Sequence, residues 1–253
     1  MISVFHFALS TLSGQARSSC LAAFDDAAGA SERARVERLG REHDRLLYRL
    51  SHGLLRLVLA REAGCAPDEL VFATSPAGKP ICPGRPFFNM SHAADRVVIA
   101  ISPNRDVGVD VEIVDAGSDV GLSASMAVAK EDRIVLPILA EARDQAETML
   151  WSIKEAALKL TGEVMTDPGH MAVRRLRDGS FHVGPSRAAT APLHDVFVRQ
   201  SWLDSSHVLS LATFEPRSAS QIVAMPESWH GPPGPNISAR ANSSASQPFA
   251  CPL

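Results

Sequence analysis

The 253-residue chain has few cysteines and no long apolar run. Its four cysteines are Cys20, Cys65, Cys82 and Cys251. They form no C-x-x-C pair and lack the spacing with histidines that a zinc site needs. No stretch reaches the roughly 18 apolar residues of a membrane span, and no basic segment precedes the apolar start MISVFHFALS, which disfavours a signal peptide. These absences predict a soluble protein of the reducing cytoplasm.

A large excess of one charge is also absent. The chain carries 25 Lys and Arg against 28 Asp and Glu, a formal net charge of −3. We therefore expect no nucleic-acid or membrane partner, although a local basic cluster could still hold a small anion. The phosphate-loop pattern G-x-x-x-x-G-K-[ST] and the dinucleotide pattern G-x-G-x-x-G do not occur. Ser91 and His92 are adjacent on a predicted strand and point to opposite faces, which disfavours a serine hydrolase dyad.

The apolar patterns that are present predict an α+β fold. Long helices are expected at residues 31–62 and 149–162, ended by Gly64 and Gly162, with short helices between residues 115 and 146 around Pro137. Strands are expected at residues 1–10, 87–92, 95–102, 106–114, 171–176, 180–183, 195–203 and 206–214.

The order of these elements predicts two similar halves. The strands at residues 95–102 and 206–214 share one pattern, which favours an N-terminal half at 1–105 and a C-terminal half at 106–215. Residues 216–253 are rich in Ser, Pro, Ala, Gly and Asn and lack periodicity, so we predict a disordered tail there.

The predicted strand DVGVDVEIV, residues 106–114, places two carboxylates on one face. Its valines line one side and read as core, while Gly108, Asp110 and Glu112 line the other. Like charges at i and i+2 repel unless a cation lies between them or one carboxylate takes up a proton. A divalent cation is one explanation, and a solvent-exposed acidic strand is the other.

The helix at 149–162 adds a third carboxylate and two lysines. Glu155 and Lys159 are four residues apart, as in an ordinary surface pair. Together with Asp110 and Glu112, Glu155 becomes a candidate oxygen ligand or general base, and Lys154 and Lys159 become candidate phosphate partners. The arginine-rich helix at 31–62 also suits phosphate, because a guanidinium can bind it through two hydrogen bonds. These residue types suit a diphosphate bridged by magnesium.

Four motifs in one order resemble a known family. GKP, FNMSH, VGVDVE and WSIKEAALKLTG resemble the 4′-phosphopantetheinyl transferases of the Sfp type, which use coenzyme A to activate carrier proteins. The resemblance covers residues 41–162 and continues more weakly to 214. It implies an α+β pseudo-dimer of two similar halves, with the active site in the cleft between them.

The resemblance also implies roles for single residues. Asp110, Glu112 and Glu155 match the magnesium-binding carboxylates, and Glu155 also matches the proposed proton acceptor. Lys159 matches a diphosphate contact. The remaining predicted coenzyme A ligands are Lys79, Ser91 and His92, together with Arg35, Arg38 and Arg41 in the basic region, where the register is less well defined.

The implied reaction moves the phosphopantetheine arm of coenzyme A onto a serine of an apo acyl, peptidyl or aryl carrier protein and releases adenosine 3′,5′-bisphosphate. A monomer is expected, because the duplicated chain supplies both walls of a cleft. The segment MAVAKEDRI, 126–134, and Glu163 after Gly162 depart from the family pattern. Two alternatives are a relative that binds coenzyme A or a carrier without turnover, and a magnesium-dependent nucleotide diphosphohydrolase.

Overall fold

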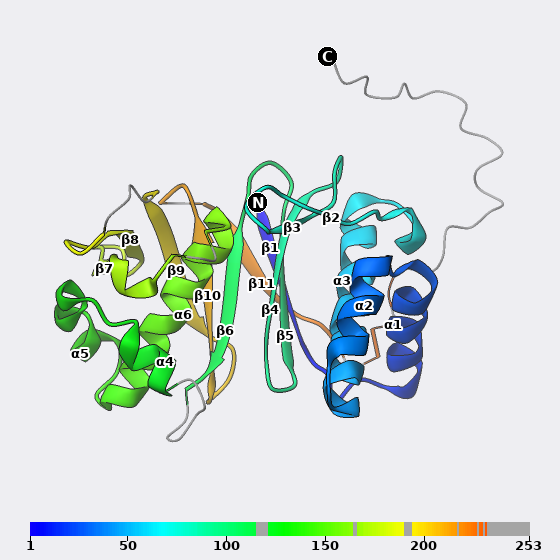
Figure 1. The fold of residues 1–253 in the computed structure, drawn as a ribbon, viewed down its shortest axis with the longest axis horizontal. Coiled ribbons are helices and arrows are strands. Elements are labelled where there is room, and N and C mark those ends of the chain that lie inside the picture. The colour runs from blue at the N-terminus through cyan, green and yellow to red at the C-terminus, as the bar shows by residue number, and fades with distance from the viewer. Residues whose placement is uncertain are drawn as a thin grey trace, which may run out of the picture.

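The protein is described by a computed structural model, which places residues 1–114, 121–163, 166–189, 194–216, 218–226, 228–229 and 231. These residues form the predicted α+β architecture, as two units that lie side by side (Figure 1). The N-terminal sheet has the strand order β11-β1-β5-β4, and the C-terminal sheet has the order β6-β10-β9-β8-β7. The pseudo-dimeric relation between the halves stays a prediction.

The helices and strands divide between the two units in the order of the chain. The N-terminal unit contains β1 Ile2–Ala8, α1 Gly14–Ala27, α2 Ala30–Arg38, α3 Glu42–Ala63, η1 Pro67–Glu69, β2 Ala73–Thr74, β3 Pro80–Ile81, β4 Phe87–Ala93 and β5 Arg96–Ser102. The C-terminal unit contains β6 Gly108–Ile113, α4 Gly121–Met126, η2 Lys130–Ile134, α5 Leu136–Leu139, α6 Arg143–Thr161, η3 Pro168–His170, β7 Met171–Arg175, β8 Phe181–Pro185, β9 Val196–Trp202 and β10 His207–Thr213. The last described strand is β11 Ser220–Ala224.

The helices differ from the prediction at their N-terminal ends. The single helix expected at 31–62 is two helices, α2 and α3, because the backbone of Leu39 and Arg41 on either side of Gly40 is extended. Helix α1, which precedes them, was not predicted, and α6 begins six residues before the expected position. Gly64 and Gly162 end α3 and α6 in the left-handed conformation, as predicted.

The valine face of β6 packs as predicted, and it joins the two units. Val107, Val109 and Val111 lie in one apolar cluster with residues of β1, β5 and β10. Asn89 of β4 reaches across the junction, where its Oδ1 accepts a hydrogen bond from Val109 N at 2.8 Å. The two sheets therefore meet along β4 and β6, and the carboxylate face of β6 is turned toward α6.

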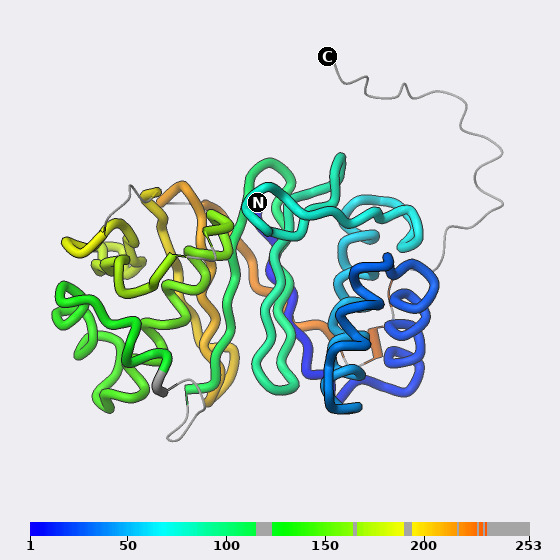
Figure 2. Tube along the Cα trace, in the orientation of Figure 1, coloured from blue at the N-terminus to red at the C-terminus, as the bar shows by residue number. Residues whose placement is uncertain are grey.

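The segment after Pro216 contradicts the predicted tail in part. Residues 220–224 form β11, which pairs in parallel with β1 from Ile2 opposite Ser220 onward. Figure 2 shows this orange stretch passing from the C-terminal unit to the N-terminal one. Its few apolar residues find partners there: the Trp229 ring lies 5.6 Å from that of Phe7. Residues 232–253, the rest of the predicted tail, lie outside the described part.

Two further features concern the whole fold. None of the helices within the described residues combines the length and the apolarity needed to cross a membrane.

Strand β6 approaches α6 so closely at Gly108 that an added Cβ would lie 2.1 Å from Ala156 O and 2.6 Å from Leu160 N. Only a residue without a side chain permits this contact, because both neighbours are backbone atoms.

Gly108→Ala should push β6 away from α6 and lower the free energy of unfolding by about 1–3 kcal/mol or more, the usual cost of overpacking. Urea denaturation followed by circular dichroism measures this loss. Gly14→Ala is the matched control, because a Cβ at Gly14 meets no atom within 4 Å. Equal stability of the two variants would contradict the packing described here.

Trp229→Ala should lower the free energy of unfolding by about 1–3 kcal/mol, because the partly buried ring covers Phe7 in the N-terminal core. A chain that ends at Pro216 should lose more, since it also leaves one edge of β1 unpaired. Thermal denaturation of both against a chain that ends at residue 231 tests this. A shortened chain that melts with the full chain would show that β11 adds no stability.

Candidate functional site

A cleft of about 480 Å³ lies where α2 and α3 face β4 and α6. Its wall combines cationic, aromatic and apolar side chains with one carboxylate. The lining residues are Arg35, Leu39, Asp44, Leu47, Tyr48, His52, Met90, Ser91, His92 and Lys159. Four predicted coenzyme A ligands, Arg35, Ser91, His92 and Lys159, therefore line one cleft, although they come from three elements far apart in the chain.

Asp110 is the centre of the hydrogen-bond network beside this cleft. Its side chain is buried, and its Oδ1 accepts hydrogen bonds from Lys159 Nζ at 2.6 Å and Ser91 Oγ at 2.9 Å. Lys159 Nζ also donates to Ser91 Oγ at 2.9 Å. The network joins β6, β4 and α6, and Ser91 donates its proton to a carboxylate, as no nucleophile of a hydrolase dyad would.

The other two carboxylates hold protons more tightly than usual. Burial, with the nearby charge of Asp110, raises the pKa of Glu112 to about 7, and Trp151 Nε1 donates a hydrogen bond to Glu112 Oε1 at 3.1 Å. Burial also raises the pKa of Glu155, where Lys159 opposes the shift and Asp110 adds to it. The three carboxylates thus carry more negative charge, when ionised, than Lys159 balances.

The carboxylates fit a divalent cation in their chemistry. Asp110 Oδ2 is buried and has no hydrogen-bond partner, and hard oxygen donors are the ligands that Mg²⁺ prefers. Among the described residues, however, no three His, Cys, Asp or Glu side chains are gathered into a set that could hold a metal ion. The charges of Asp110, Glu112 and Glu155 influence one another. Their side chains are not, however, gathered into the complete ligand set predicted from the sequence.

His92 lies on the same strand as Ser91 and is exposed at the cleft. The surrounding protein removes part of its hydration and lowers its pKa, and the charge of Lys159 lowers it further. The neutral ring can therefore offer a hydrogen-bond donor to an anion without the cost of a charge.

Lys154 was predicted to be a phosphate ligand, and the structure corrects this prediction. Its side chain is 0% exposed, and its Nζ donates to Asp132 Oδ2 at 2.6 Å. It also donates to the backbone oxygens of Ala127, Pro168 and Met171 at 2.7, 2.9 and 2.7 Å. An ammonium group enclosed in this way cannot reach a phosphate, so the lysine is structural.

The structure also corrects the prediction that Lys79 is a coenzyme A ligand. It is 7% exposed, and its Nζ donates to Asp106 Oδ1 at 2.8 Å, Val107 O at 2.9 Å and Leu160 O at 3.3 Å. These acceptors use all three of its N–H groups. The side chain ties the start of β6 to the end of α6 and does not line the cleft.

The basic region and the aromatic wall complete the site. Of the three arginines predicted there, Arg35 lines the cleft, while Arg38 and Arg41 are exposed and do not. Tyr48 and His52 were not predicted, yet their rings stack at a centroid distance of 3.8 Å and line the cleft. Their i, i+4 spacing on a predicted helix was the available signal.

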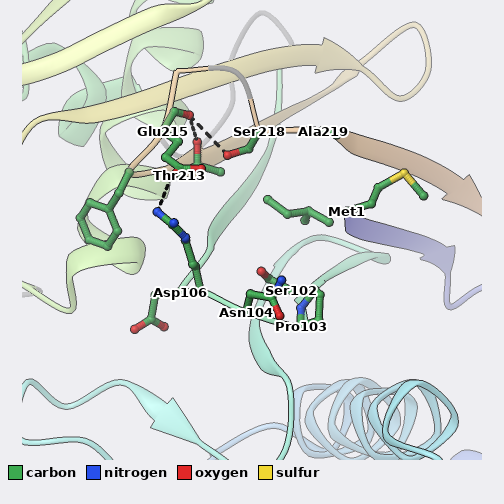
Figure 3. A pocket seen from close by; sticks show the side chains of 12 residues that line it. Met1, Ser102, Pro103, Asn104, Asp106, Thr213, Glu215, Ser218 and Ala219 are labelled. Carbon is green, nitrogen blue, oxygen red and sulfur yellow. Dashed lines mark hydrogen bonds and ion pairs between the residues drawn. The ribbon is translucent and has the colours of Figure 1, made fainter.

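A second pocket of about 160 Å³ lies apart from this chemistry (Figure 3). It is lined by the chain end at Met1, the loop after β5 and the loop after β10, where Arg105 and Glu215 form an ion pair. None of the predicted site residues lines it. Its charged side chains are already paired, Arg105 with Glu215 and Asp106 with Lys79, so it offers no alternative centre for the reaction.

Lys154→Met should lower the free energy of unfolding by about 3–5 kcal/mol, because it leaves the carboxylate of Asp132 buried without its counter-charge. Chemical denaturation measures this loss. The double variant Lys154→Met/Asp132→Asn should lose less than the sum of the single losses, since it removes both charges. A single variant as stable as the original chain would restore Lys154 to the candidate ligands.

Comparison with known proteins agrees with this geometry. Residues 106–212, which include β6 and α6, match the family model of the 4′-phosphopantetheinyl transferase superfamily. A Synechocystis protein, slr0495, provisionally named a 4′-phosphopantetheinyl transferase, is 32% identical over 52% of this chain and 56% of its own. The match thus spans little more than half the length of that relative.

Two further relatives match over longer stretches. The 4′-phosphopantetheinyl transferase HetI of Nostoc is 26% identical over 64% of this chain and 68% of its own. The 4′-phosphopantetheinyl transferase psf-1 of Bacillus pumilus is 27% identical over 76% of this chain and 81% of its own.

Proposed function

We propose that this chain, which matches the family model of the 4′-phosphopantetheinyl transferase superfamily over residues 106–212 and resembles transferases of that name, transfers the 4′-phosphopantetheine arm of coenzyme A to a serine of an apo carrier protein. Adenosine 3′,5′-bisphosphate is the other product. The observation that carries the proposal is Asp110, whose buried Oδ2 has no hydrogen-bond partner and whose Oδ1 pairs with Lys159 at a cleft that Arg35 also lines. A diphosphate with its cation suits this arrangement.

In the proposed complex, the residues of the cleft bind and orient coenzyme A. Lys159 lies next to the carboxylates and holds the diphosphate, while His92 and Arg35 hold the 3′-phosphate end. The apolar wall formed by Leu39, Leu47 and Met90 excludes water from the same space. Ser91 supports the site indirectly, because its hydroxyl fixes Asp110.

The proposed chemical step is a displacement at phosphorus. The carrier serine oxygen bonds to the phosphorus on the pantetheine side of the diphosphate, and the bond from that phosphorus to the bridging oxygen breaks. The serine proton passes to Glu155, whose raised pKa makes it a stronger base than an ordinary glutamate. Lys159 stabilises the negative charge that the departing bisphosphate gains.

A divalent cation, proposed to be magnesium, would be held by Asp110 and Glu112 with Glu155. When bound, it neutralises charge on the diphosphate. The raised pKa values of Glu112 and Glu155 and the unpartnered oxygen of Asp110 support a cation at this position. Lys159 pairs with Asp110 here, and its ammonium group also lines the cleft, where it would face the diphosphate.

The proposed protein partner is an apo acyl, peptidyl or aryl carrier protein. Two large apolar side chains support a protein-facing surface on the C-terminal unit: Met126 is 74% exposed and Ile134 is 78% exposed. Both lie in the segment 126–134, which departs from the family pattern and so bears on carrier preference. We propose a cytoplasmic protein, since Cys20, Cys65 and Cys82 are free thiols, and a monomer, since one chain supplies both walls of the cleft.

Intact-protein mass spectrometry tests the reaction. Apo carrier proteins of each class are incubated with the protein, coenzyme A and Mg²⁺, and a parallel sample contains EDTA. A carrier that gains the mass of one phosphopantetheine group only without EDTA supports the proposal. Free phosphopantetheine would favour the diphosphohydrolase, and bound coenzyme A without any product would favour the binding protein.

Asp110→Asn should reduce transfer by about 100-fold or more, because it removes the charge at the centre of the network while the size of the side chain is kept. Initial rates of carrier modification measure the effect. Asp195→Asn is the matched control, since Asp195 pairs with His182 on the far strands of the C-terminal sheet. Undiminished transfer by the Asp110 variant would remove this carboxylate from the mechanism.

A further inference from the structure

Helix α2 carries one wall of the cleft but has no apolar anchor. None of its residues is buried, although Arg35 and the following Leu39 line the cleft. Most helices in proteins are held by an apolar face packed on the core. The position of α2, and with it that of Arg35, must depend on polar contacts instead.

Arg33 of α2 donates to Asp25 O at 2.6 Å and Ala28 O at 3.1 Å, at the end of α1, and Glu32 supplies the contacts to α3. Its Oε2 accepts hydrogen bonds from Arg56 Nη2 at 2.5 Å and from the backbone N of Gly29, the N-cap residue of α2, at 3.0 Å. Its Oε1 lies 3.4 Å from His52 Nδ1. The carboxylate therefore caps its own helix and connects it to two side chains of α3.

The partners of Glu32 on α3 are themselves fixed. Arg56 is 1% exposed, its Cζ lies 4.6 Å from the centroid of the Phe72 ring, and its Nη1 donates to Leu70 O at 3.4 Å. His52 stacks on Tyr48, and both rings line the cleft. A rigid base on α3 thus holds Glu32, one helical turn before Arg35.

The ionised form of Glu32 is maintained by the same neighbours. Burial of the carboxylate opposes ionisation, but hydrogen bonds from His52 and Gly29 N and the charge of Arg56 outweigh burial and lower its pKa. The ion pair with Arg56 therefore persists at neutral pH, and the anchor does not depend on a proton.

We propose that Glu32 is a positioning residue for ligand binding: by joining α2 to Arg56 and His52, it holds Arg35 against the phosphate-binding end of the cleft. The inference rests on the proposed function and deepens it. Glu32 does not itself line the cleft. Its effect passes through α2, so it should act on the binding of coenzyme A and leave the chemical step to the carboxylates and Lys159.

Glu32→Gln tests this proposal. Loss of one charge-assisted contact should raise the dissociation constant for coenzyme A, measured by titration calorimetry, and the KM for coenzyme A by roughly tenfold. The kcat should stay unchanged, and hydrogen exchange should speed up in α2 but not in α3. Asp25→Asn is the matched control, because it removes the Arg49 ion pair from the same helical layer, while the contact of Asp25 with α2, from Arg33 Nη2 to its backbone oxygen at 2.6 Å, does not involve the substituted carboxylate.

A second variant guards against a folding defect. Glu32→Asp keeps a negative charge near Arg56 but is too short for all three contacts, so it should fold and raise the KM less than Glu32→Gln. Combined with Arg35→Ala, Glu32→Gln should add little to the effect of Arg35→Ala alone, because both act through one side chain.

The outcomes separate the two proposals. An unchanged dissociation constant and KM in Glu32→Gln, or effects of Glu32 and Arg35 that simply add, would overturn the positioning role while transfer by the original chain stands. If the original chain binds coenzyme A but transfers nothing, the proposed function fails, and the calorimetric comparison still decides the role of Glu32. If the original chain does not bind coenzyme A, both fail.

Discussion

The site depends on one close contact, that of strand β6 with helix α6 at Gly108. Backbone meets backbone there, and the distance leaves no room for a Cβ. Two residues further along β6, Asp110 then lies within hydrogen-bond distance of Lys159 on α6. A larger separation would break that ion pair and expose the carboxylate face to water, where it would keep its ordinary acidity. Packing thus sets the electrostatics of the site.

The same strand also connects the two units. Its valine face completes an apolar cluster with the N-terminal sheet, while Asn89 and Ser91 of β4 bond to its backbone and to Asp110. The ligands of the cleft therefore come from both units, and neither unit contains the site by itself. The geometry of the site therefore depends on the relative position of the two units, which the close packing along β6 fixes.

Much of this arrangement was predictable from particular residues. The alternation in DVGVDVEIV correctly separated core valines from carboxylates, and the i, i+4 pair on α6 placed Glu155 and Lys159 on one face. The burial of Lys154 was also readable: it lies four residues after Leu150 and three before Ala157, on the apolar face. The burial of Lys79 depends on partners 27 and 81 residues away, which local patterns do not contain.

Strand β11 shows why the predicted tail was wrong at its start, and it has a consequence for biosynthesis. Its short apolar run is too brief to predict a strand, and its partner lies far away, with Gln221 and Ser3 separated by 218 positions. On the ribosome, strand β1 emerges first, and the edge that β11 takes stays unpaired until the whole C-terminal unit has been made. The N-terminal sheet is therefore completed only after the C-terminal unit has been synthesised, and expressing the halves as separate polypeptides divides a sheet, not a linker.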